Sequence, residues 1–205
     1  MAQDDTVYVI DDDPAMRDSL EFLLDSAGFP VMLFESASVF LAQLPGLKLG
    51  CVVSDIRMPG INGMDMLRTL RERRPDLPVI LMTGHGDIPL AVEAIKLGAR
   101  DFLEKPFEDE QLVGAIRSAL RQAKDSGRND GAASDLAARV ASLSPRERQV
   151  MDGLIAGLSN KLIARDHDIS PRTIEVYRAN VMTKMQAGSL SELVRLAMRS
   201  GMLSD

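Results

Sequence analysis

Cysteine and histidine are scarce in this sequence, with one and two residues among 205. One thiol cannot form an intrachain disulfide, and Cys51 lies in the apolar run Cys51–Val53, which indicates a buried core side chain. So few soft or imidazole ligands also argue against a zinc site. No apolar run approaches the roughly 18 residues that a membrane helix needs, and the first residues lack the basic and apolar segments of a secretion signal. These absences predict a cytoplasmic protein without membrane association.

The composition excludes disorder as the main state, because 45% of the residues are hydrophobic and 26% are charged. A chain of this length can bury one large core or two small ones. Residues 1–125 carry 13 basic and 21 acidic side chains, whereas residues 126–205 carry 11 and 9. This asymmetry indicates that the two halves have different partners.

In residues 1–122, short apolar runs alternate with segments of helical periodicity. Strands that are apolar throughout and separated by helices predict a parallel sheet covered on both faces. We therefore expect a doubly wound α/β domain with five strands in the order 2-1-3-4-5. The expected strands are Val7–Ile10, Val31–Phe34, Cys51–Val53, Val79–Met82 and Asp101–Leu103.

The remaining chain contains no strand pattern. Residues 123–142 are small and polar and predict a linker, with a helical turn near Leu136–Val140. Residues 143–205 predict an all-α domain of four helices. Ser144–Glu147 and Ser189–Glu192 have the pattern of capping boxes, and Gly201 is expected to end the last helix.

Acidic residues follow two neighbouring strands of the expected sheet. Asp11 and Asp12 come directly after the first strand, and Asp55 follows the third. Because functional sites in parallel α/β sheets lie at the carboxyl ends of the strands, we expect the three carboxylates to converge. Such carboxylates repel one another unless a cation compensates them, and an all-oxygen ligand set favours Mg²⁺.

Two more strand ends carry suitable side chains, the hydroxyl of Thr83 and the amine of Lys105. A carboxylate nucleophile, a divalent metal, a hydroxyl and a lysine are the parts needed to accept a phosphoryl group on an aspartate. Each residue alone also fits a plainer role: a helix cap for the first acidic run, a turn for Asp55, a cap for Thr83, a surface position for Lys105.

Four segments resemble the receiver domain of two-component response regulators over residues 1–122. They are Val9–Asp13, Ser54–Gly63, Thr83–Gly86 and Asp101–Phe107. The resemblance implies that a sensor histidine kinase phosphorylates Asp55. It also implies that Lys105, in a cis peptide with Pro106, holds the phosphoryl group, that Thr83 moves toward it, and that Phe102 takes the place of a switch tyrosine. The magnesium ligands it implies are Asp11, Asp12, Asp55 and the backbone carbonyl of Arg57.

The receiver half is also compatible with an aspartyl-phosphate phosphatase of the haloacid-dehalogenase type. In that family a second aspartate follows the nucleophile by two residues, and here that position is Arg57. No general acid for substrate turnover is evident, so we expect a phosphoacceptor signalling protein rather than an enzyme.

In the helical half, a second helix ending near His167 and a third beginning at Ser170 have helix-turn-helix spacing. Periodicity places Ile174, Tyr177, Val181 and Met185 inward. The outward face can contact base edges and phosphates in the DNA major groove. A protein-binding helical module is the alternative. The candidate DNA contacts are Arg172, Thr173, Glu175, Val176, Arg178, Asn180, Lys161 and Lys184.

Residues 143–203 resemble the LuxR-type helix-turn-helix in three segments, Leu143–Val150, Gly157–Ala164 and Ile169–Tyr177. The whole chain resembles the NarL/FixJ class of response regulators. The resemblance implies a homodimer, formed after phosphorylation through the fourth helix, fifth strand and fifth helix of the receiver. It further implies binding to double-stranded promoter DNA and contact with RNA polymerase as an activator. The receiver motifs are closest to those of a nitrogen-fixation regulator, which implies control of nitrogen-fixation or low-oxygen genes. Glu175 and Ala179 stand where relatives carry lysines, so the target sequence does not transfer.

Overall fold

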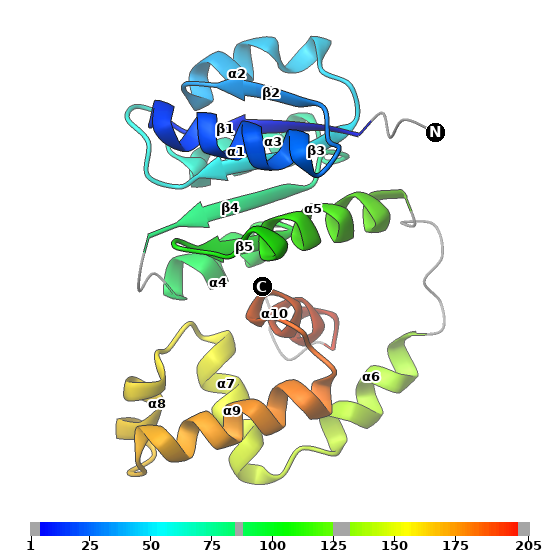
Figure 1. Ribbon diagram of the computed structural model, residues 1–205. Coiled ribbons are helices and arrows are strands. Elements are labelled where there is room, and N and C mark those ends of the chain that lie inside the picture. The colour runs from blue at the N-terminus through cyan, green and yellow to red at the C-terminus, as the bar shows by residue number, and fades with distance from the viewer. Residues whose placement is uncertain (1–4, 85–87, 125–131, 201–205) are drawn as a thin grey trace. The chain divides into compact units, whose positions relative to one another are not determined.

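The computed structural model describes residues 5–84, 88–124 and 132–200 of the chain (Figure 1). The chain divides into two compact units, residues 1–86 with 97–127 and residues 87–96 with 128–205. Within the described ranges, no helix is long and apolar enough to cross a membrane.

The first unit is built on a parallel sheet in the predicted order β2-β1-β3-β4-β5. Val53 of β3 pairs with Val9 on one side and Ile80 on the other, so the apolar runs lie side by side in the centre. Every strand except β2 is longer than predicted, by one to three residues, and β3 and β4 end on Asp55 and Thr83. The strands are β1 (Thr6–Ile10), β2 (Val31–Phe34), β3 (Gly50–Asp55), β4 (Val79–Thr83) and β5 (Asp101–Glu104).

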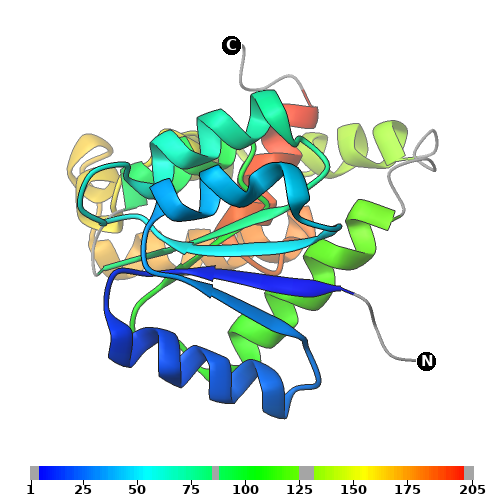
Figure 2. The same cartoon turned by 90° about the horizontal axis from the view of Figure 1, so that it is seen from above.

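Helices cover both faces of this sheet, α1 and α5 on one side and α2 and α3 on the other (Figure 2). Leu24 of α1 and Ile116 of α5 pack on Val7 and Val53 in a core that excludes water, which is the main stabilising contribution of this layer. The segments are α1 (Pro14–Ser26), α2 (Ala37–Gln43), the 3₁₀ turn η1 (Leu44–Gly46), α3 (Gly63–Arg73) and α5 (Asp109–Lys124).

The second unit is helical. The four helices predicted from residue 143 onward are present, and α4 and a further helix, α6, also belong to this unit. Leu154, Val181 and Leu193 are fully buried and belong to its core. The helices are α4 (Ile88–Lys96), α6 (Ala132–Ala141), α7 (Pro145–Ile155), α8 (Asn160–Asp166), α9 (Pro171–Met185) and α10 (Leu190–Arg199).

The predicted linker, residues 123–142, contains more helix than expected, because α5 continues to Lys124 and α6 occupies residues 132–141. A ten-residue helix is marginal by itself and needs tertiary contacts. Buried Leu136 and a hydrogen bond from Arg139 Nη1 to the Met185 carbonyl (3.3 Å) provide them. The helical turn predicted near Leu136–Val140 is therefore the centre of a complete helix.

Both predicted helix caps form, but only the first is a full capping box. Ser144 Oγ accepts from the Glu147 amide at 3.3 Å, and Glu147 Oε2 accepts from the Ser144 amide at 2.7 Å. Ser189 caps α10, whereas Glu192 accepts from Gly188 rather than from Ser189. Helix α10 ends at Arg199, and the predicted stop at Gly201 lies outside the described residues.

Candidate functional site

The carboxyl ends of four strands bring the predicted site residues of the first unit to one edge of the sheet. Asp11 follows β1 and Asp55 ends β3, and these strands are neighbours with Ile10 paired to Ser54. Thr83 ends β4, and Lys105 follows β5. The sheet order therefore places an amine and a hydroxyl beside two carboxylates that are far apart in the sequence.

Lys105 joins the two buried carboxylates. Its Nζ lies 2.6 Å from Asp55 Oδ1 and 3.0 Å from Asp11 Oδ2, and the Asp11 and Asp55 side chains are 3% and 12% exposed. Burial lowers the pKa of Lys105, but the hydrogen bonds to Asp55 and Asp11 outweigh it and raise the pKa above its usual value. One ammonium thus compensates part of the charge of two carboxylates and leaves a net negative site.

The other carboxylate oxygens are held by the backbone. Asp11 Oδ1 accepts from the Asp13 amide at 3.0 Å, and Asp55 Oδ2 accepts from the Arg57 amide at 2.6 Å. Arg17 of α1 donates from Nη1 to the Asp11 carbonyl at 2.7 Å. Both acidic side chains are therefore fixed before any ligand arrives, which lowers the cost of reorganisation.

Gly63 controls the loop after Asp55. Its amide donates to the Ile56 carbonyl at 2.9 Å. A Cβ at this position would lie 2.5 Å from the Asp55 carbonyl oxygen. Only glycine permits this close approach of α3 to the end of β3.

The three predicted carboxylates do not all converge. Asp12 is exposed, and Asp13 instead caps α1 by accepting from the Ala15 amide at 2.9 Å. Within the described ranges, no group of three or more acidic, histidine or cysteine side chains is placed to hold a metal ion. The donor chemistry nevertheless fits Mg²⁺, because the donors are oxygens and Lys105 neutralises only one of the two buried negative charges.

The remaining two receiver residues lie on the adjoining strands. Thr83 is 1% exposed, and its hydroxyl donates to the Gly84 carbonyl at 3.3 Å. Its own carbonyl accepts from the Lys105 amide at 2.8 Å, which links the ends of β4 and β5. Phe102 is half-buried on β5 opposite Leu81, and the Lys105–Pro106 peptide is cis, as expected.

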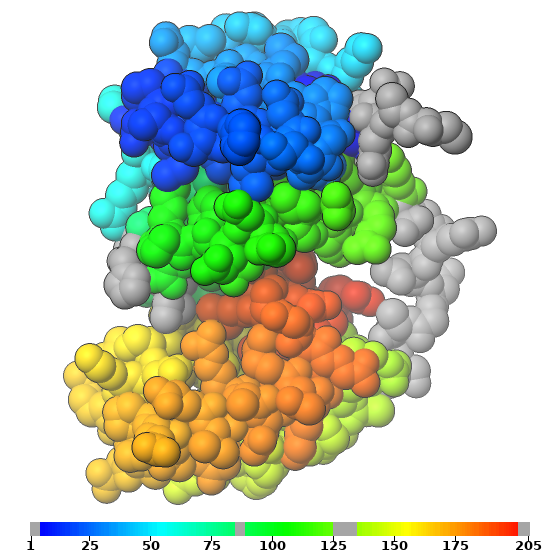
Figure 3. All heavy atoms as spheres, viewed as in Figure 1, coloured from blue at the N-terminus to red at the C-terminus, as the bar shows by residue number. Residues whose placement is uncertain are grey.

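Helix α9 has the buried face and the exposed face that its periodicity predicts. Ile174, Val181 and Met185 are buried and Tyr177 is half-buried, while Val176 is 58% exposed. Figure 3 shows α9 (orange) with one side uncovered. Of the candidate DNA contacts, Arg178 is half-buried and the others are exposed: Arg172, Thr173, Glu175, Val176, Asn180, Lys184 and, on α8, Lys161.

Lys184 has a partner within its own domain that the sequence reasoning missed. Its Nζ lies 2.7 Å from Glu147 Oε2, on a side chain that is 6% exposed, and 3.2 Å from the Ser142 carbonyl. The hydrogen bond from Lys184, and after it the one from the Ser144 amide, hold the pKa of Glu147 below its usual value. Lys184 thus connects the end of α9 to the cap of α7, and its predicted phosphate contact stays a prediction.

Two known families account for most of the chain. Residues 7–117 match the response regulator receiver domain, and residues 141–197 match the luxR family of bacterial regulatory proteins. The chain is 70% identical to the transcriptional regulatory protein FixJ of Bradyrhizobium diazoefficiens, over 97% of both chains. It is also 44% identical to the response regulator protein TmoT of Ectopseudomonas mendocina, over 96% of this chain and 90% of TmoT. This chain is a response regulator of the NarL/FixJ class.

Solved structures agree with this assignment. Full-length FixJ from B. japonicum is similar to the regulator with a TM-score of 0.59 and 70% identity over 98% of both chains. The response regulator StyR gives 0.56 and 40% identity over 96% of this chain and all of StyR. A receiver domain implies a histidine kinase partner, and a LuxR-type domain implies DNA binding. The regulator is therefore a transcriptional regulator of a two-component system.

Arg17 and Gly63 are site residues that sequence reasoning missed. Arg17 acts through a backbone carbonyl, and such a contact leaves no pattern in the periodicity of α1. Gly63 carries a signal in principle, because a glycine that opens a helix after Asn62 is unusual. The close approach that explains Gly63 becomes visible only when β3 and α3 are placed together.

Proposed function

We propose that Asp55 accepts a phosphoryl group from a histidine kinase. The observation that carries this proposal is Lys105 bridging the buried carboxylates of Asp55 and Asp11 at the carboxyl edge of the sheet. An Asp55 oxygen attacks phosphorus, the phosphorus–nitrogen bond of the phosphohistidine breaks, and the imidazole leaves with a proton. Lys105 then transfers its hydrogen bond from Asp55 to a phosphoryl oxygen.

Magnesium belongs to the same proposal. Asp11, Asp55, a reoriented Asp12 and the Arg57 carbonyl would bind it. When bound, the ion neutralises charge that develops on the phosphoryl oxygens. The chain itself supplies the nucleophile, the ammonium group and the backbone amides that orient both carboxylates.

The consequence of phosphorylation passes through Thr83 and Phe102. The Thr83 hydroxyl, which donates to the Gly84 carbonyl at 3.3 Å, turns toward the phosphoryl group, and Phe102 repacks on β5. Phe102 lacks a hydroxyl, so it responds through packing alone. The altered face of α4, β5 and α5 forms a homodimer, which shifts the population toward a DNA-binding state.

In this proposal the chain consists of a receiver at residues 1–122, a linker at 123–142 that includes the whole of α6, and a DNA-binding domain at 143–205. The exposed side of α9, with Lys161 of α8, contacts promoter DNA, and a dimer occupies two half-sites about one helical turn apart. The similarity to FixJ supports an activator of nitrogen-fixation or low-oxygen genes that contacts RNA polymerase.

A groove beside Lys105 is the docking surface that this proposal assigns to the kinase. A cavity of about 740 Å³ lies between α1 and the segment after β5, with Leu23, Pro106 and Phe107 among its walls, and Lys105 lines it too. Phe22, at its edge, is 77% exposed, which is unusual for a phenylalanine that faces only water. A phosphodonor bound here would be next to the amine that contacts Asp55.

The test is incubation of the full chain with acetyl phosphate, with and without Mg²⁺, followed by intact mass and peptide mapping. We expect one Mg²⁺-dependent phosphoryl adduct at Asp55, dimerisation, and tighter salt-dependent promoter binding. Asp55→Asn removes the carboxylate nucleophile and should give none of the three. An Asp55→Asn protein that still dimerised and bound DNA in response to the phosphodonor would overturn the proposal.

A further inference from the structure

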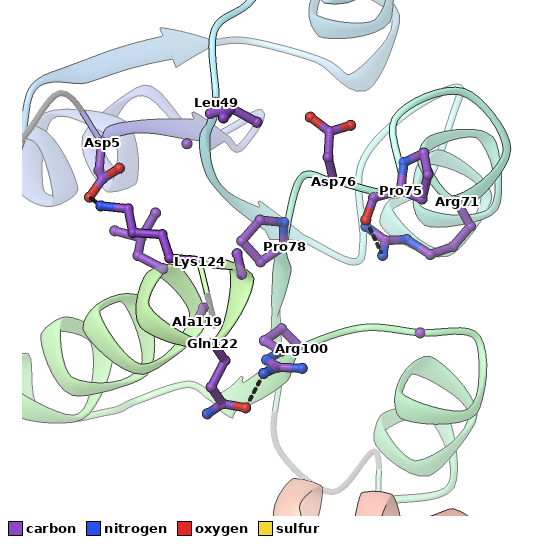
Figure 4. Close-up of a pocket in the computed structure, with 14 residues that line it drawn as sticks. Asp5, Leu49, Arg71, Pro75, Asp76, Pro78, Arg100, Ala119, Gln122 and Lys124 are labelled. Atoms are coloured by element: carbon purple, nitrogen blue, oxygen red, sulfur yellow. Dashed lines mark hydrogen bonds and ion pairs between the residues drawn. The ribbon is translucent and has the colours of Figure 1, made fainter. Parts of the chain in front are cut away.

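A second cavity of the first unit, of about 620 Å³, lies at the amino-terminal ends of the strands (Figure 4). Asp5 precedes β1, Gly50 begins β3, Pro78 precedes β4 and Arg100 precedes β5, and all four residues line it. The phosphoacceptor residues lie at the carboxyl-terminal ends of the same strands. The two sites therefore occupy opposite edges of the sheet.

The size and walls of this cavity suit a small organic molecule. Its volume is within the range of roughly 300–1,000 Å³ that is typical of ligand pockets. Side chains from different segments surround the space in Figure 4, and apolar ones alternate with charged and polar ones. The apolar lining residues are Leu49, Pro75, Pro78, Ala119, Leu120 and Ala123.

The acids that line the cavity are already neutralised. Asp5 accepts from Lys124 Nζ at 2.6 Å. Asp76 accepts from Arg74, with 2.8 Å between Nη2 and Oδ2 and 2.9 Å between Nε and Oδ1. Three cations and two acids line the space, and Arg74 lies outside it. The surroundings of the cavity are therefore positively charged.

Arg71 lines the cavity without a carboxylate of its own among the described residues. Its Nη1 donates to the Pro75 carbonyl at 3.3 Å and its Nη2 donates to the Leu77 carbonyl. Its Nε is buried and has no hydrogen-bond partner in the described part of the chain. A guanidinium has five N–H donors, so these two bonds leave the second N–H of each terminal nitrogen for a ligand, besides the buried Nε. Burial lowers the pKa of Arg71, and the nearby carboxylate of Asp76, which is bound to Arg74, offsets this only in part.

Gly98 allows Arg71 to take this position. A Cβ at Gly98 would lie 2.9 Å from Arg71 Cδ, and the backbone there has φ +96°, a conformation that favours glycine. The alkyl part of Arg71 thus rests on a bare backbone while its guanidinium binds the turn before β4. The cavity is built from five separate segments of the chain rather than from one mobile surface side chain.

We propose that this cavity binds a small organic anion, with its carboxylate or phosphate on Arg71 and its apolar part among the proline, leucine and alanine side chains. A bidentate pair with the free N–H groups would supply the compensating charge that Arg71 lacks. The receiver would then have a second ligand site besides its phosphoacceptor. Because the sites lie at opposite edges, binding does not depend on Asp55.

The test is titration of the full chain with benzoate, inorganic phosphate and acetate, followed by calorimetry and by NMR of the receiver amides. We expect saturable binding of benzoate at one site per chain, weaker binding of the ions without an apolar body, and shifts at Leu49, Arg71 and Gly98. Arg71→Gln should raise the benzoate Kd at least tenfold. Arg68→Gln is the matched control, because Arg68 lies one turn earlier on α3 and pairs with Asp65 on the surface.

Two further variants distinguish loss of the anion site from loosening of the turn before β4 and from failure of the phosphoacceptor site. Ala123→Trp fills the cavity from its exposed rim while leaving Arg71 intact, so it should abolish benzoate binding even if Arg71→Gln loosens the turn before β4. Asp55→Asn should bind benzoate as the parent does, whether or not the receiver accepts phosphate. No saturable binding of benzoate, or equal loss in the Arg68 and Arg71 variants, would overturn the proposal. If inorganic phosphate bound as tightly as benzoate, the proposed contacts between an apolar part of the ligand and the cavity wall would be contradicted.

Discussion

The ammonium of Lys184, near the end of α9, lies 2.7 Å from a carboxylate oxygen of Glu147, in the first turn of α7. The same carboxylate oxygen accepts from the Ser144 amide, and Lys184 also donates to the Ser142 carbonyl. One ion pair thus connects the exposed helix α9 to the cap of α7. The orientation of α9 depends on this connection.

Lys184 and Lys161 should differ in their effect on DNA binding. Lys161 is exposed on α8, so Lys161→Ala should reduce the slope of log K against log salt concentration by about 0.9, the value for one phosphate contact. Lys184→Ala should leave that slope unchanged and lower the thermal stability of the helical domain. Measurement of promoter affinity at several salt concentrations checks both. An equal fall in the slope in the two variants would show that Lys184 contacts a DNA phosphate.

The Glu147–Lys184 pair predicts a pH dependence of stability. The pKa of Glu147 is lower in the folded chain than the value of about 4.3 in an unfolded one. The pair therefore stabilises the domain above about pH 4.3 and loses this effect as the pH falls through the folded-state pKa. Glu147→Gln should lower the melting temperature at pH 7, and its melting temperature should approach that of the parent once the pH is below the folded-state pKa of Glu147. Asp152→Asn, exposed on the same helix, is the control and should show no such convergence.

Lys105 should compete with Mg²⁺. In the structure its ammonium binds Asp11 and Asp55, and a divalent ion needs those same oxygens. Lys105→Met should tighten Mg²⁺ binding several-fold, because two carboxylates without a cation repel each other, and should weaken the response to phosphorylation. Lys124→Met removes a similar ion pair at the other edge of the sheet and should leave Mg²⁺ affinity unchanged. Calorimetric titration with Mg²⁺ checks this, and weaker binding in the Lys105 variant would refute it.

Gly63→Ala should damage the phosphoacceptor loop. The new methyl group would lie 2.5 Å from the Asp55 carbonyl oxygen, and relief of such overpacking costs about 1–3 kcal/mol. We expect lower stability in urea and slower phosphorylation by acetyl phosphate. Gly114→Ala is the control, since Gly114 lies inside α5 with open space around it and alanine there should stabilise by about 0.5–1 kcal/mol. Unchanged phosphorylation in the Gly63 variant would show that the loop tolerates displacement.

Phe22→Ala should slow phosphorylation by the kinase but not by acetyl phosphate. The side chain is 77% exposed beside the groove that Lys105 lines, so its removal should slow transfer from the phosphorylated kinase at least several-fold. Acetyl phosphate does not need this surface and should react at the parent rate. Met32→Ala, another exposed apolar side chain, on β2, should affect neither reaction. Equal rates from the kinase in all three proteins would place its docking surface elsewhere.

Local pattern was enough to predict the five strands, the four helices after residue 143 and the sheet order. Buried parallel strands are continuous apolar runs, and helix caps such as Ser144 and Ser170 are residues whose side chains bind neighbouring amides. These relationships extend over only a few residues. The position of Asp11, Asp55, Thr83 and Lys105 at one edge also follows, because parallel strands present all their carboxyl ends together.

The partners of the charged side chains were decided by the tertiary structure alone. Asp11 binds Lys105, which lies 94 residues further along the chain. Lys184 binds Glu147, 37 residues away, and Arg71 is left beside a cavity because Asp76 binds Arg74. A charged side chain can pair with any opposite charge that lies close to it. Its partner therefore depends on which segments the packing brings together, and the periodicity of the sequence does not show which distant segments become neighbours.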